Sequence, residues 1–428
     1  MPVVQATAVA LLALIASHCS SSSASSAGNA TKPPPPMRVD FDPPALLLPD
    51  RAMASTGNVR VLSITAGASD VLVADPIARE VTWLAGCPAH CVAQVFRDHF
   101  LAPVRTAVSD LDGDGDRDIV VTDIGSLVDD PAHIGAIALL ENDGHGSFLP
   151  ARVLVDKLHR PACAEPADLD GDGDVDLIGC MFGVGPPTGE LAWFEQRRDH
   201  SFVHHAIDPI SGTIVGLPWD ADGDGDLDVV ALVSRTAEEI DLYVNDGKGT
   251  FTKQHIFQSG NDCYGFSSLE LFDLDGDGRL DLLSTNGDSA HPECSREEIA
   301  KLHGVAWFRN LGELRFERHA ITQLYGAYVA RVADFNGDGA PDIVAASFRD
   351  FQNALTDPTP NLVYLENDGH QAFTRREIPG GPPAVITLDV GDLDGDGTPD
   401  LVTGSLEADA PAPGAHRLAF FRGRRTPR

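Results

Sequence analysis

The sequence predicts an all-β fold, a seven-bladed β-propeller with about four antiparallel strands per blade. The first observation is an acidic nine-residue loop that recurs six times, with its copies starting 52 to 61 residues apart. The second is a short apolar run after each loop, such as IVVT or VVAL, which is typical of a buried strand. The third is an aromatic strand followed by a hairpin turn, as in LVYLENDGHQAF.

The number of blades follows from the aromatic or large apolar residue that marks the third strand of each unit. This residue occurs seven times, at Trp83, Leu139, Trp193, Tyr243, Trp307, Tyr364 and Phe420. The first unit, residues 59–99, keeps its strands but has lost the acidic loop, of which only Asp70 remains. The last unit lacks an outer strand after Phe420, and we expect residues 37–42 to supply it and close the ring. A superhelical β-solenoid is the alternative, although its repeats are normally shorter.

Three segments are expected along the chain. Residues 1–27 form a signal peptide or lipoprotein signal, residues 28–50 a Ser/Pro-rich linker with a possible ring-closing strand, and residues 51–428 the propeller. The apolar run at residues 8–16 is too short to remain as a membrane span, and no other run is longer, so no transmembrane span is expected. The location expected is secreted, periplasmic or cell-surface.

Cys19 is a possible lipid anchor, since a Ser-rich tether follows it. However, His18 stands where a small residue is expected, and cleavage after Ala24 or Ala27 is the alternative. The other six cysteines form three neighbouring pairs in an exported chain, which indicates disulfides. Local pairing is the expectation, although six cysteines allow fifteen connectivities. The expected local pairs are Cys87 with Cys91, Cys163 with Cys180, and Cys263 with Cys294.

The formal net charge of −33 disfavours nucleic acid and anionic lipid as partners and favours cations. Most of the acidic residues in the loops are Asp, in the pattern D-x-[DN]-x-D-G-x-x-D. Gly at the sixth position allows the sharp turn that brings the acids together, and position seven offers its carbonyl. An all-oxygen ligand set suits Ca²⁺, with Mg²⁺ the second choice.

We therefore expect up to six Ca²⁺ ions, held at positions one, three, five, seven and nine of the loops. These positions are Asp110, Asp112, Asp114, Asp116 and Asp118; Asp168, Asp170, Asp172, Asp174 and Asp176; Asp220, Asp222, Asp224, Asp226 and Asp228; Asp273, Asp275, Asp277, Arg279 and Asp281; Asp334, Asn336, Asp338, Ala340 and Asp342; and Asp392, Asp394, Asp396, Thr398 and Asp400. The alternative is an acidic solvated turn, but six copies with clustered carboxylates repel strongly without a cation. Position twelve lacks the Glu of an EF-hand. The fifth loop has the fewest carboxylates and is expected to be the weakest site.

The loops, the WFEN-type strands and the G-x-F turns resemble the FG-GAP or VCBS repeat family, which also forms the integrin α-subunit propeller. The resemblance covers about residues 59–425. It implies a seven-bladed propeller with Ca²⁺ in blade loops, at Asp110, Asp112, Asp114 and Asp118 and the matching positions of the other five loops. It does not extend to the loop of the first unit, and it does not fix a function.

The function expected is an exported binding or adhesion module, a monomer with an extracellular glycan or protein ligand. The connection before the aromatic strand is enlarged in five units, which gives a ligand surface on one face. One alternative is a polysaccharide lyase or hydrolase, using Glu165, Glu270, Arg331 and Asp389 on inner strands. Another is a scaffold or partner for redox proteins. No zinc-protease, G-x-S-x-G or phosphate-binding motif occurs, so no catalytic residue is assigned.

Overall fold

The computed structural model describes residues 37–48, 53–64, 69–128, 132–183, 188–288, 294–348, 361–382, 384–405 and 417–427. All of them belong to the second of two units, residues 37–428. The expected signal segment, Cys19 and the first part of the linker lie outside the described residues. Among the described residues, no helix is long and apolar enough to span a membrane.

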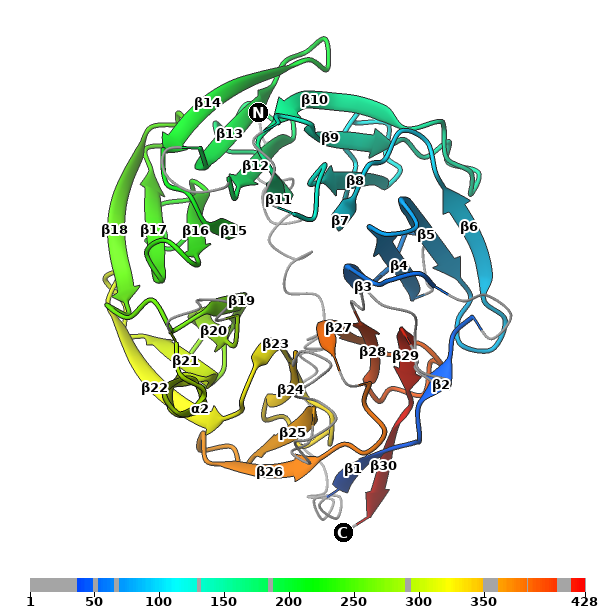
Figure 1. Cartoon of the computed structure of the whole chain (residues 1–428), viewed down its shortest axis with the longest axis vertical. Helices are drawn as coiled ribbons and strands as arrows, with labels where there is room; N and C mark the ends of the chain where they lie inside the picture. Colours follow the sequence, from blue (N-terminus) through cyan, green and yellow to red (C-terminus); the bar gives the residue numbers. More distant parts are fainter. Residues whose placement is uncertain are drawn as a thin grey trace, which may run out of the picture. The chain divides into compact units, whose positions relative to one another are not determined.

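The predicted all-β fold is confirmed, because seven four-stranded antiparallel sheets are arranged around a common centre (Figure 1). The strands of blades one to three are β3 (Asn58–Leu62), β4 (Asp70–Asp75), β5 (Glu80–Ala85) and β6 (Val92–Phe96); β7 (Pro103–Ser109), β8 (Asp118–Asp123), β9 (Gly135–Leu140) and β10 (Arg152–Leu158); β11 (Pro161–Ala167), β12 (Asp176–Met181), β13 (Glu190–Gln196) and β14 (Phe202–Asp208).

Blades four to seven repeat this order, except that the last blade takes its fourth strand from the N-terminal side of the chain. Their strands are β15 (Thr213–Trp219), β16 (Asp228–Val233), β17 (Glu239–Asn245) and β18 (Phe251–Gln258); β19 (Phe266–Phe272), β20 (Asp281–Asn286), β21 (Gly304–Asn310) and β22 (Phe316–Gln323); β23 (Ala327–Ala333), β24 (Asp342–Ser347), β25 (Leu362–Asn367) and β26 (Phe373–Glu377); β27 (Val385–Gly391), β28 (Asp400–Ser405), β29 (Leu418–Phe421) and β2 (Ala45–Leu46).

The first strand of each blade is the inner one and contacts the inner strands of both neighbouring blades, including β27 with β3 across the closure (Figure 1). The second strand of every blade is buried along its whole length, since neighbouring blades cover both of its faces. This explains the continuous apolar runs after the acidic loops. One hydrophobic cluster fills each of the seven interfaces between adjacent blades.

The ring closure differs from the expectation that residues 37–42 form the outer strand of the last blade. That strand is β2, which pairs with β29, whereas β1 (Met37–Phe41) pairs with the C-terminal strand β30 (Gly423–Pro427) in a sheet of two. Pro43 and Pro44 separate β1 from β2 and have no amide hydrogen to donate, so a single continuous strand cannot form there. Both terminal segments therefore take part in the closure.

The three expected disulfides are present and local. They join Cys87 to Cys91, Cys163 to Cys180 and Cys263 to Cys294. The third bond ties the connection between β20 and β21 to the start of blade five. The same connection contains helix α2 (Arg296–Leu302), whose first turn is capped by the Ser295 side chain accepting from the backbone amide of Glu298.

Candidate functional site

Each acidic loop joins an inner strand to the second strand of its blade, so all six lie at the same end of the sheets. In the first loop, the backbone amide of Gly115 donates to Asp110 Oδ2 at 3.0 Å, and that of Asp114 donates to Asp112 Oδ1 at 3.2 Å. Gly113 and Gly115 have φ angles of 77° and 98°, which other residues rarely adopt. The glycines and these side-chain bonds together curl the loop, as the motif predicts.

The acid at position nine is buried and joins its loop to the third strand. Asp118 Oδ2 accepts from the amide of Leu111 at 3.0 Å, and Oδ1 accepts from the amide of Asn142 at 2.9 Å. The same two-sided contact recurs at Asp176, Asp228, Asp281 and Asp400. Burial raises the pKa of Asp118 to about 6 and that of Asp176 to about 7, and the neighbouring carboxylates add to this effect.

The structure brings the acids at positions one, three and nine together. In the loops of blades two to five, one ligand atom from each of these acids lies within 4.8 Å of the others: Asp110, Asp112 and Asp118; Asp168, Asp170 and Asp176; Asp220, Asp222 and Asp228; and Asp273, Asp275 and Asp281. The residues at position five are exposed in all six loops, and they are not members of these groups.

The first loop has an atom that suits a bound cation. Asp110 Oδ1 is buried, and no hydrogen-bond partner is found for it among the described residues. An oxygen in this state is costly unless a cation or water meets it. The ligand set therefore fits a hard cation such as Ca²⁺.

The fifth loop, which belongs to blade six, has Asn at position three. Asn336 is fully buried and accepts from the amide of Asp338 at 2.8 Å, so its amide oxygen keeps the place of the usual carboxylate. Ala340 at position seven has only its backbone carbonyl to offer. The loop keeps the curl of the others with less negative charge.

In the first blade, which lacks the acidic loop, an arginine from blade two contacts the corresponding connection. Asp70 accepts from the amide of Ile64 at 3.1 Å, much as Asp118 accepts from the amide of Leu111. The guanidinium of Arg117, from the loop of blade two, donates to the carbonyl of Ser63 at 2.7 Å. Residues 65–68 of this connection lie outside the described residues.

A further group of candidate metal ligands was not found from the sequence. Glu239, Asp241 and His255 have ligand atoms within 4.8 Å of one another, because Glu239 and Asp241 alternate on β17 and His255 lies opposite on β18. The Lys253 ammonium lies among them, 2.8 Å from Asp241 and 3.2 Å from Glu239. The lysine thus offsets part of the negative charge of the group. The alternating Glu-x-Asp pattern was visible, but the strand register was needed to place the histidine.

The four residues considered for catalysis lie on inner strands and are engaged with arginines. Arg331 Nε lies 2.9 Å from Asp389 Oδ1, and its Nη1 lies 4.0 Å from Glu270 Oε2. Glu165 pairs with Arg105 at 3.1 Å. Burial raises the pKa of Glu270 to about 7, although Arg331 opposes the shift. The arrangement is a set of ion pairs around the centre of the ring.

The enlarged connections all leave from the end of the sheets opposite to the acidic loops, because each joins a second strand to a third. At this end, two guanidinium groups lie near the Phe182 ring, that of Arg160 at 5.1 Å and that of Arg235 at 5.5 Å from its centroid. The rings of Tyr328 and Phe348 pack edge to face at 5.5 Å. Cationic and aromatic groups therefore gather on a face of an otherwise acidic protein. Much of the enlarged connections themselves lies outside the described residues.

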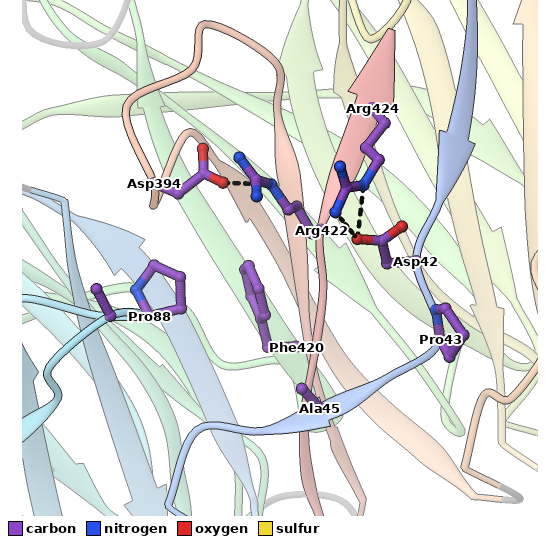
Figure 2. A pocket seen from close by; sticks show the side chains of 9 residues that line it. Asp42, Pro43, Ala45, Pro88, Asp394, Phe420, Arg422 and Arg424 are labelled. Atoms are coloured by element: carbon purple, nitrogen blue, oxygen red, sulfur yellow. Dashed lines mark hydrogen bonds and ion pairs between the residues drawn. The ribbon is translucent and has the colours of Figure 1, made fainter. Parts of the chain in front are cut away.

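A pocket of about 400 Å³ lies beside the ring closure (Figure 2). Its walls are Asp42, Pro43, Ala45, Pro88, Ala89, Asp394, Phe420, Arg422 and Arg424. Both arginines are paired with acids in this view, Arg422 with Asp394 and Arg424 with Asp42. The polar groups of the pocket are thus engaged with one another.

The fold and the loops define a seven-bladed propeller with six acidic loops. A family model described as an FG-GAP-like repeat matches residues 110–179 and 220–284. The chain thus contains FG-GAP-like repeats in two places, within the propeller that the resemblance implied.

Two solved structures are similar over most of their length. One is a luciferin-regenerating enzyme, with 12% identity over 90% of this chain and 95% of the other and a TM-score of 0.43. The other is the V. cholerae biofilm matrix protein Bap1, with 11% identity over 90% and 91% and a TM-score of 0.45. At these TM-scores neither similarity bears on function. No curated protein matches the chain significantly.

Proposed function

We propose that the protein is an exported, calcium-stabilised binding module whose ligand, an extracellular glycan or protein, docks on the face with the enlarged connections. The observation that carries this proposal is the division of the ring into two faces. The acidic loops share one end of the sheets, and five enlarged connections leave from the other. Structural cations and ligand contacts are thereby assigned to different surfaces.

Calcium is supported by the six loops and by the buried Oδ1 of Asp110, for which the described part of the chain offers no hydrogen-bond partner. The ions would be held by the acids at positions one, three and nine, with position five and the position-seven carbonyl completing the set. Bound calcium supplies positive charge to the clustered carboxylates. The residues themselves fix the loop, because the position-nine acid anchors it to the third strand. The role that follows is structural, stiffening each blade.

Ligand binding is supported by the character of the opposite face. Phe182 and Arg235 offer an aromatic surface with a guanidinium that is half-exposed, although it also lies 3.9 Å from Asp288, and such a surface suits sugar rings or acidic groups. The base of the longest connection is held by the bond between Cys263 and Cys294 and by the capped helix α2. An oxidising, extracytoplasmic location is part of the same proposal, and the disulfides agree with it.

A glycan array tests the binding function, run on the full chain with calcium and after EDTA. We expect binding with calcium, and a loss of at least tenfold for Arg235→Ala. Lys248→Ala is the matched control, since Lys248 is exposed in a turn at the acidic-loop end. Equal loss in both variants, or no binding to any glycan or candidate protein, contradicts the proposal. Turnover of a polysaccharide that Glu270→Gln abolishes would favour the enzyme alternative instead.

A further inference from the structure

Two of the six acidic loops have an arginine among the carboxylates proposed as calcium ligands. In the loop of blade five, Arg309 Nε lies 2.6 Å from Asp275 Oδ2. In the loop of blade seven, Arg422 Nε lies 2.5 Å from Asp394 Oδ2, and Figure 2 shows this pair at the edge of the pocket. Asp275 and Asp394 are both the position-three acid of their loop.

The two arginines occupy the same place in the repeat. Each directly precedes the residue whose backbone amide donates to the position-nine acid, at 2.7 Å from Asn310 to Asp281 and at 2.9 Å from Gly423 to Asp400. The other loops have an acidic or apolar residue in this place: Glu141, Glu195, Val244 and Glu366. At this position, Arg in place of Glu makes the charge of each of the loops of blades five and seven two units more positive than in the three loops with Glu.

Each arginine also reaches the acid at position five. Arg422 Nη2 lies 3.1 Å from Asp396 Oδ2, and Arg309 Nη2 lies 3.9 Å from Asp277 Oδ2. In blade five a second arginine, Arg279 at position seven, pairs with Asp277 as well. The guanidinium groups thus engage two of the carboxylates on which calcium binding depends.

Burial makes these pairs difficult to displace. The side chains of Asp275 and Asp394 are only 5% and 13% exposed. Removing the guanidinium leaves a buried charge unpaired, and keeping it places a fixed positive charge beside the incoming ion. No basic side chain pairs with Asp112, Asp170 or Asp222 in the part of the chain that the structure describes.

We propose that Arg309 and Arg422 are built-in counterions, so that calcium fills the loops of blades two, three, four and six while those of blades five and seven fold without it. The inference rests on the calcium binding proposed above. It changes the ranking expected from carboxylate counts, which placed the blade-six loop last. An arginine within the loop lowers the calcium affinity more than the absence of one carboxylate does. Its guanidinium pairs with carboxylates that would otherwise bind the ion, and its positive charge repels the ion.

The calcium stoichiometry of the EDTA-treated, calcium-resaturated full chain tests this, by native mass spectrometry and by metal analysis after dialysis. We expect about four ions per chain, one for each loop whose carboxylates pair with no arginine among the described residues. The blade-six loop is one of them, because Arg425 donates there to the backbone carbonyls of Asp334 and Phe335 and leaves the carboxylates to the ion. Five or six ions overturn the inference and leave calcium binding intact. No bound calcium overturns both the inference and the calcium proposal.

Variants assign the ions to loops. Arg309→Glu and Arg422→Glu install the residue of blades two, three and six, and each is expected to add one ion. Glu141→Arg makes the reverse change in blade two and is expected to remove one. An unchanged count in all three overturns the inference. If a Glu variant does not fold, Arg309→Gln and Arg422→Gln replace it, and the measurement is the rise in melting temperature on adding calcium. This rise is larger in the Gln variants than in the wild type if the arginine competes with calcium. A smaller rise means that the arginine supports a bound ion, and it overturns the inference.

Discussion

The hydroxyl of Tyr364 donates a 2.6 Å hydrogen bond to Oδ2 of Asp342, the last acid of the blade-six loop. The other carboxylate oxygen accepts from the backbone amide of Asn367 at 2.8 Å. One buried acid therefore links the loop to the aromatic residue by which the blades can be counted in the sequence. The two features that predicted the propeller are in direct contact here.

Tyr364→Phe is expected to lower the free energy of unfolding by about 1–2 kcal/mol, because one oxygen of a buried carboxylate loses its partner. Urea unfolding measures the change. Tyr243→Phe is the control, since the hydroxyl of Tyr243 donates to Asp208 on the outer strand of blade three and does not contact a loop. Calcium should protect the wild type and Tyr243→Phe equally and Tyr364→Phe less. Identical protection of all three would show that the bond does not support the loop.

Calcium removal is expected to lower the melting temperature of the whole propeller. A single site at a hundred times its dissociation constant stabilises by about 2.7 kcal/mol, and the effects of separate sites add. Differential scanning fluorimetry with calcium and with EDTA measures the difference. Asp110→Ala should reduce this difference by about the share of one site, because the buried Asp110 Oδ1 has no hydrogen-bond partner among the described residues. A melting temperature independent of calcium would contradict a structural role.

His303 is expected to make the protein sensitive to acid. Its ring is buried, which lowers its pKa from the ordinary 6.5 to about 4, and its Nδ1 accepts from the amide of Gly326 at 3.1 Å. The folded state then holds fewer protons than the unfolded state between these values. This contribution to stability is complete above pH 6.5 and is lost as the pH falls toward 4.

Between pH 7.5 and 5, the wild type should therefore lose about 2 kcal/mol through this residue. His303→Asn keeps an acceptor near the amide of Gly326 and has no ring to protonate. The difference in unfolding free energy between the wild type and this variant, measured in urea at both pH values with calcium present, isolates the contribution. A difference that does not change with pH would show that His303 is not responsible.

The repeats were enough to predict most of the fold. Contacts between side chains on different strands could not be predicted from the sequence. Loop spacing and the aromatic residues were enough to predict seven blades, because each blade repeats the same local pattern. The pairing of Arg309 with Asp275 spans 34 positions and depends on strand register. The same holds for His255 beside Asp241. Counting carboxylates within each loop could not reveal side chains that enter from another strand.

The ring closure should depend on the N-terminal strands. Val39 on β1 is buried in the cluster between blades six and seven, and the Phe41 ring lies 5.7 Å from Phe335 and 6.1 Å from Tyr364. Deleting residues 1–46 removes these contacts, leaves β30 without its partner strand and exposes the edge of β29, which then pairs with β28 alone. We expect a lower melting temperature and aggregation.

Deleting residues 1–36 is the matched control and should leave the melting temperature unchanged, because the closure begins at Met37. The point variant Phe41→Ala should cost about 2 kcal/mol through lost packing alone, with both strand pairs kept. Thermal unfolding and light scattering of the three proteins give the test. If the longer deletion melts like the shorter one, the other blades hold the ring without the terminal strands, and the two-segment closure is dispensable for stability.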